Sequence, residues 1–243
     1  MKSKPLKKKK DNLKQKTQVG INPIFLVAIG ASAGGLEALE KLIRTIPKND
    51  FLSYVIIQHL DPHKPSLMDT ILAKYTNLTV KLIENDDRLK KNTIFLNPAD
   101  KYVILQNGRF ILEDYQETQP LHFSIDHFLC SAAIEKGEHA IAVILSGTGT
   151  DGTIGINSIK ANGGLVIAQS TEQAKYDGMP QSAINSGLVD FILDAEKMID
   201  EILLYVTHPI IMLDEKKTND DELQINYSQL FSIIRAKTGN DFS

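Results

Sequence analysis

Three absences in this chain of 243 residues exclude several classes of protein. A single cysteine, Cys130, excludes an internal disulfide framework and is typical of the reducing cytoplasm, where we expect the protein to act. No cluster of Cys and His has the spacing of a metal site, and we expect neither a metal nor a cofactor. No apolar run approaches the roughly 20 residues of a membrane span, so we expect no membrane insertion.

The most distinctive stretch, residues 24–39, lacks the phosphate-binding spacings G-x-G-x-x-G and G-x-x-x-x-G-K-[ST]. Six apolar residues there predict a strand, small residues predict a turn, and apolar positions at helical spacing predict a helix from near Gly35. The turn, residues 30–34, fits G-x-S-x-G, a pattern that exposes a nucleophilic serine, here Ser32. From this stretch alone, a phosphate site and a plain connection are alternatives.

Positive charge is concentrated at the beginning of the chain. Residues 1–18 carry eight lysines and one aspartate, although the whole chain has a net charge of −3, and they show no apolar periodicity. We therefore expect residues 1–22 to form a disordered basic tail. Such a tail is either solvated or in contact with an acidic partner or a lipid surface.

Apolar strands alternate with helices through residues 23–206, which we expect to form one domain. Strands are expected at 24–29, 54–57, 78–83, 93–96, 140–145, 165–168 and 188–193, and helices at 35–47, 66–75, 124–136, 152–161, 180–185 and 194–206. Asn107-Gly108 predicts a hairpin between two further strands, and Ser124 is expected to cap the helix that it begins. The pattern predicts the α/β class: a three-layer α/β/α domain with a doubly wound, mainly parallel sheet and an antiparallel hairpin.

Three polar residues follow predicted strands, namely Ser32, His59 and Asp151. Because the carboxyl ends of parallel strands meet at one edge of a sheet, we expect these side chains to lie close together. A serine hydroxyl needs a base to take its proton, and the base needs an orienting carboxylate, so the three predict a catalytic triad. His63 and Asp61 are the alternatives for the base and the carboxylate. The order Ser–His–Asp differs from that of the α/β-hydrolases and indicates another topology.

Five short motifs follow one another between residues 23 and 205. They are GASAGG at 30–35, Gln58-His59, Ser124-Ile125-Asp126, GTGTDG at 147–152 and Gly178-Met179-Pro180. In this order they resemble the CheB family of chemoreceptor protein-glutamate methylesterases. The resemblance implies a triad of Ser32, His59 and Asp151 that hydrolyses the γ-methyl esters of receptor glutamates. Family members can also deamidate receptor glutamines.

The same resemblance implies an oxyanion and substrate pocket and shows three departures from the family pattern. The pocket residues would be Ala33, Gly34, Thr148, Gly149 and Met179. Family members commonly have methionine at the position of Thr148 and threonine or serine at that of Ala33. They usually carry an N-terminal receiver domain, where this sequence has only the lysine-rich tail. A catalytically weak docking or regulatory module is therefore the alternative to an active esterase.

The resemblance also implies partners. The substrate would be the methylated cytoplasmic helices of chemoreceptors, and no nucleic-acid partner is expected. Residues 227–243 resemble the opening of the CheR methyltransferase, so we expect residues 207–243 to be a linker and the start of a CheR-like domain, which would adjoin the esterase. A helix followed by a frayed end is the alternative for this segment.

Overall fold

The computed structural model describes residues 23–60, 67–115 and 122–207. The chain divides into two units, Met1–Ile199 and Asp200–Ser243, and the described part of the second is the C-terminal portion of helix α6 (Met198–Thr207). The expected basic tail and the expected linker and following domain, apart from residue 207, lie outside the described residues.

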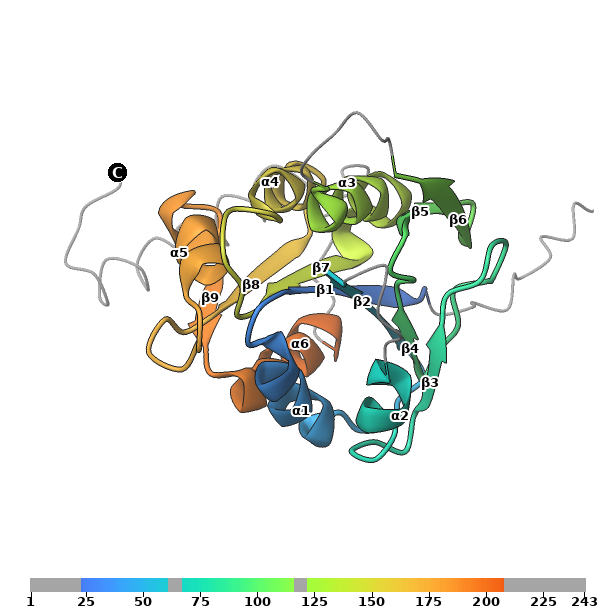
Figure 1. The fold of residues 1–243 in the computed structure, drawn as a ribbon, viewed down its shortest axis with the longest axis horizontal. Coiled ribbons are helices and arrows are strands. Elements are labelled where there is room, and N and C mark those ends of the chain that lie inside the picture. The colour runs from blue at the N-terminus through green and yellow to red at the C-terminus, as the bar shows by residue number, and fades with distance from the viewer. Residues whose placement is uncertain (1–22, 61–66, 116–121, 208–243) are drawn as a thin grey trace, which may run out of the picture. The chain divides into compact units, whose positions relative to one another are not determined.

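Seven parallel strands form the sheet of the first unit, in the order β3-β4-β2-β1-β7-β8-β9 (Figure 1). Their bounds are β1 Phe25–Ala31, β2 Leu52–Gln58, β3 Thr79–Leu82, β4 Thr93–Leu96, β7 Ala140–Ile144, β8 Leu165–Gln169 and β9 Phe191–Leu193. The strand order reverses at β1, which pairs with β2 on one side and β7 on the other. Such a switch point is where open α/β sheets place their sites, beyond the carboxyl ends of the strands.

Helices cover both faces of this sheet (Figure 1). Helices α1 (Gly35–Thr45) and α2 (Met68–Leu72) lie on one face, and α3 (Ser124–Lys136), α4 (Thr153–Ala161) and α5 (Gly178–Asn185) lie on the other. Short 3₁₀ turns occupy Gly137–His139 and Ala195–Lys197. An antiparallel hairpin of β5 (Lys101–Gln106) and β6 (Arg109–Asp114) packs beside α3. The expected three-layer, doubly wound fold with one hairpin is confirmed.

The central strands β1 and β7 carry only apolar residues and glycine because both of their faces are covered. Alternate residues of β1 point to opposite faces, and Leu26 and Ala28 enter the core beneath α3 with Phe128 and Leu129. All four are at most 1% exposed. Each fully buried leucine or phenylalanine contributes about 1.5–3 kcal/mol relative to an exposed position, so this packing fixes α3 against the sheet.

Three predicted details of the elements were wrong. Helix α2 is shorter than expected because the N–H groups of Lys74 and Tyr75 bond to carbonyls three residues earlier, as in a tight turn. Strand β9 begins at Phe191 instead of residue 188. Helix α3 begins at Ser124, but no side chain at its own start caps it, and a residue far along the chain supplies the acceptors instead.

Candidate active site

The turn after β1 presents Ser32 at the carboxyl edge of the sheet. The Ser32 N–H donates to the carbonyl of Ser146 over 2.9 Å, and the Gly35 N–H donates to the carbonyl of Ser32 over 2.9 Å. The left-handed backbone conformation that the turn requires falls on Gly34, with φ of 72°, where a side chain would be strained. Helix α1 starts at the next residue, so its positive end lies beside Ser32.

A chain of hydrogen bonds joins the three residues that follow β1, β2 and β7. The distance from Ser32 Oγ to His59 Nδ1 is 3.0 Å, and that from His59 Nε2 to Asp151 Oδ2 is 2.7 Å. The strand register explains why Ser32 and His59 are close: Ala31 at the end of β1 pairs with Gln58 at the end of β2, and Ser32 and His59 are the residues that follow them. With the proton on Nε2, the imidazole donates to the carboxylate and offers Nδ1 as an acceptor to the hydroxyl.

Asp151 is buried, whereas the imidazole of His59 is one-third exposed. Besides the imidazole, the carboxylate accepts the N–H of Ile125 at Oδ2 over 3.0 Å and the N–H of Asp126 at Oδ1 over 2.8 Å. Both donors lie in the first turn of α3. The positive end of that helix therefore holds the carboxylate in place and compensates its burial.

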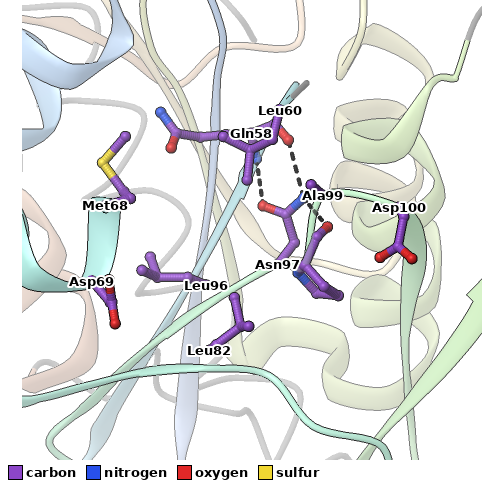
Figure 2. Close-up of a pocket in the computed structure, with 10 residues that line it drawn as sticks. Gln58, Leu60, Met68, Asp69, Leu82, Leu96, Asn97, Ala99 and Asp100 are labelled. Atoms are coloured by element: carbon purple, nitrogen blue, oxygen red, sulfur yellow. Dashed lines mark hydrogen bonds between the residues drawn. The ribbon is translucent and has the colours of Figure 1, made fainter. Parts of the chain in front are cut away.

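The backbone leading to His59 is held by Asn97, which follows β4 (Figure 2). Its side-chain oxygen accepts the N–H of Gln58 over 2.8 Å, and its amide donates to the carbonyls of Gln58 over 3.0 Å and Pro98 over 3.1 Å. All of these groups are buried or half-buried. Sequence reasoning did not find Asn97, although a polar residue directly after a buried strand is the same signal that marked Ser32 and His59.

Replacing Asn97 with alanine leaves the buried N–H and carbonyl of Gln58 without partners. We expect the unfolding free energy to fall by about 1–3 kcal/mol and kcat for a small ester to fall on the order of tenfold or more, because His59 is no longer held. Asn49→Ala is the matched control, since Asn49 clamps the backbone of Phe51 and Leu52 at the opposite end of β2. It should lose stability in urea unfolding yet keep kcat. Equal kcat in both variants would contradict a link to His59.

Ser146, two residues beyond the end of β7, connects four segments around the nucleophile turn. Its hydroxyl donates to the carbonyl of Ala33 over 2.9 Å and accepts the N–H of Tyr176 over 3.0 Å. Its N–H donates to Oε1 of Gln169 over 2.8 Å. The predicted pocket residues Ala33 and Gly34 are thereby fixed to the end of β7. Ser146 was also missed, although it follows an apolar strand just as Ser32 does.

The other predicted pocket residues, Thr148 and Gly149 on the loop after β7 and Met179 at the start of α5, lie on segments that are bonded to each other. Met179 is buried, and its N–H donates to the carbonyl of Gly147 over 2.9 Å, while the Gly147 N–H donates to the carbonyl of Tyr176 over 2.9 Å. Thr148 and Gly149 are exposed. Within the described residues, the N–H groups of Ala33, Thr148 and Gly149 have no recorded acceptor.

A pocket of about 290 Å³ opens at the carboxyl ends of β2, β3 and β4 (Figure 2). Its walls include Leu82, Leu96 and Met68, and Asp69 and Asp100 also line it. Gln58, the residue before His59, contributes to the wall, so the pocket lies on the same sheet edge as His59.

His63 and Asp61, the alternative base and carboxylate, lie outside the described residues. Among the residues that the structure describes, no group of three or more His, Cys, Asp or Glu side chains is arranged to hold a metal ion. Within the same residues, no helix has the length and apolar character needed to cross a bilayer.

The fold and this edge define the chain as a three-layer α/β protein with a serine-centred polar site at its topological switch point. A family model described as CheB methylesterase matches residues 27–202. The chain belongs to the CheB methylesterase family.

Individual proteins agree with this membership. The chain is 34% identical over 182 residues to a protein-glutamate methylesterase/protein-glutamine glutaminase of Thermotoga maritima, covering 73% of this chain and 53% of that protein. It is 35% identical over 190 residues to one of Carboxydothermus hydrogenoformans, covering 76% and 56%. The chain thus spans about half the length of these curated relatives. The crystal structure of the Thermotoga maritima CheB methylesterase catalytic domain matches with a TM-score of 0.70 at 34% identity, covering 74% of this chain and 98% of that one.

Proposed function

We propose that this chain hydrolyses the γ-methyl esters of glutamate side chains in chemoreceptors. The observation that carries the proposal is the hydrogen-bonded chain from Ser32 through His59 to Asp151 in a member of the CheB family. The relatives' names, protein-glutamate methylesterase/protein-glutamine glutaminase, supply the substrate class.

In the first half of the reaction, Ser32 Oγ attacks the ester carbonyl carbon while His59 Nδ1 takes the hydroxyl proton. The new C–O bond produces a tetrahedral oxyanion and an imidazolium, and the latter is stabilised by Asp151 across the 2.7 Å contact with Nε2. The imidazolium then returns the proton to the methoxy oxygen. The C–O bond to that oxygen breaks, methanol leaves, and an acyl-serine is formed.

In the second half, His59 takes a proton from water, and the water oxygen attacks the acyl carbon. The bond between that carbon and Ser32 Oγ then breaks, His59 returns its proton to Oγ, and the glutamate is released. A glutamine side chain follows the same route with ammonia as the leaving group, since both substrates give the same acyl-serine. The glutaminase part of the relatives' name supports including this reaction in the proposal.

The oxyanion requires donors that are already in place. The positive end of α1 lies beside Ser32, and the exposed loop after Ser146 carries backbone N–H groups at Thr148 and Gly149 that have no recorded acceptor within the described residues. We assign the oxyanion site to these groups together with Ala33 and Gly34. A backbone donor does not depend on the side chain, so threonine at residue 148 is compatible with this role.

The proposed setting is receptor adaptation in the cytoplasm, with methylated receptor helices as substrate. An adjoining methyltransferase domain is supported only by the sequence of residues 227–243, which lie outside the described part of the chain.

The direct test measures methanol released from methylated receptor fragments, with labelling of Ser32 by a serine-reactive phosphonate as a second readout. An active esterase releases methanol in proportion to the enzyme concentration and is labelled by the phosphonate only at Ser32. Labelling without methanol would leave an active serine with another substrate. If no methanol is released and Ser32 is not labelled, the result would favour the docking module.

A further inference from the structure

Helices α3 and α4 begin beside each other without caps of their own. The residue before α3 is Phe123 and the residue before α4 is Gly152, and neither provides a side-chain acceptor. The first N–H groups of a helix have no partner within the helix, so each start needs an acceptor from elsewhere.

Each helix obtains that acceptor from the start of the other. Asp151, which precedes α4, accepts the N–H groups of Ile125 and Asp126 in the first turn of α3 over 3.0 and 2.8 Å. In return, Oδ1 of Asp126 accepts the N–H of Gly155 in the first turn of α4 over 2.7 Å. The two aspartates therefore exchange caps, and one of them is the carboxylate that holds His59.

Close packing of the two helices makes the exchange possible. A Cβ on Gly155 would lie 2.4 Å from Cβ of Leu129 in α3, so only glycine permits this approach. Asp126 is 7% exposed. Burial, the largest effect, raises the pKa of Asp126 to about 6, the charge of Asp151 acts in the same direction, and the N–H groups at the start of α4 oppose it. Burial therefore favours the uncharged carboxyl group, and the neutral amide of asparagine resembles that form.

We propose that Asp126 is a positioning residue for the triad: by capping α4 from α3, it fixes the segment that carries Asp151 and so holds Asp151 at bonding distance from His59. Asp126 does not touch the substrate. The inference rests on the proposed function for its kinetic consequence, but the positioning of Asp151 can be measured without any turnover.

The test without turnover is the proton NMR signal of the His59 Nε2–H that bonds to Asp151, which is strongly shifted downfield in a short bond to a carboxylate. We expect Asp126→Ala to lose or broaden this signal and Asp126→Asn to keep it, because the amide oxygen still accepts the Gly155 N–H. Glu135→Ala is the matched control on the same helix. Glu135 accepts the N–H groups of Asn107 and Gly108 in the hairpin, so its loss should leave the signal unchanged.

The kinetic test uses a small chromogenic ester, p-nitrophenyl acetate. We expect Asp126→Ala to lower kcat by about 10- to 100-fold with little change in KM, and Asp126→Asn to restore it. In an Asp151→Asn background, adding Asp126→Ala should change kcat no further, because its effect passes through Asp151. A general loss of structure would instead reduce kcat equally in both backgrounds.

An unchanged downfield signal in Asp126→Ala, failure of Asp126→Asn to restore it, or an equal kcat loss in both backgrounds would each overturn the inference. If Asp126→Ala does not fold by circular dichroism, Asp126→Ser, whose hydroxyl is too short to reach Gly155, takes its place under the same criteria. A normal signal pattern in a protein with no esterase activity would refute the proposed function and leave the positioning intact.

Discussion

Replacement of Ser32 with alanine is expected to lower kcat for methyl-ester hydrolysis by about a millionfold, the loss seen when a serine hydrolase loses its nucleophile. No other atom of the turn can form the acyl intermediate once Oγ is gone. Methanol release from methylated receptor fragments and hydrolysis of a small ester are the two measurements. Both should fall together, because the acyl-serine is common to both reactions.

The variant should fold normally, since the recorded side-chain bond of Ser32 is to His59, and its other bonds use the main chain. Ser186→Ala is the matched control: it removes a hydroxyl that bonds to the carbonyl of Ala183 at the end of α5. That control should keep its activity. Substantial hydrolysis by Ser32→Ala would assign the chemistry to another residue.

Asp151→Asn has the second-largest expected effect, a fall in kcat on the order of ten-thousandfold. The carboxylate accepts three donors, from His59, Ile125 and Asp126. An amide has only one accepting oxygen, so its NH₂ group must face at least one of those donors. With the NH₂ group in the place of Oδ2, His59 loses the tautomer that offers Nδ1 to Ser32, and with it in the place of Oδ1, the start of α3 loses part of its cap. In both orientations the imidazolium loses the negative charge that stabilises it.

The same variant should also lose stability, by about 1–3 kcal/mol for an unsatisfied buried donor. Asp190→Asn separates the two effects, because Asp190 accepts the Val166 N–H and pairs with Lys160 away from the triad. It should be destabilised in urea while keeping kcat. If Asp151→Asn retained kcat to within about tenfold, Asp151 would not be the orienting carboxylate.

The sequence was sufficient to predict the layers of the fold and the edge of the sheet at which the polar residues lie close together. Fully apolar strands predicted a covered parallel sheet, and that topology brings Ser32 and His59 to the same level, as the pairing of Ala31 with Gln58 shows. Their catalytic roles stay predictions until the variants above are measured.

The partners of these residues could not be predicted in the same way. Ser124 looked like a cap from local sequence, but the acceptors at the start of α3 come from Asp151, 25 and 26 residues away from the donors. Asn97 reaches Gln58 across 39 residues. Such bonds depend on how closely helices and strands pack, and no periodicity of apolar residues records that distance. Asp126 belonged to a recognised motif, yet its bond to Gly155 became visible only with both helices in place.

The bonding of Gly147 and Ser146 bears on how this protein can change during evolution. The peptide that precedes Thr148 is fixed through Gly147, whose N–H donates to the carbonyl of Tyr176 and whose carbonyl accepts the N–H of Met179. The Ser146 hydroxyl in turn accepts the N–H of Tyr176, while Thr148 itself is exposed. A mutation at residue 148 can therefore alter the wall of the proposed pocket without displacing the peptide N–H beside it. Under the proposed function, substitutions at this one position would change substrate selectivity while the backbone donor, and with it the rate, is preserved.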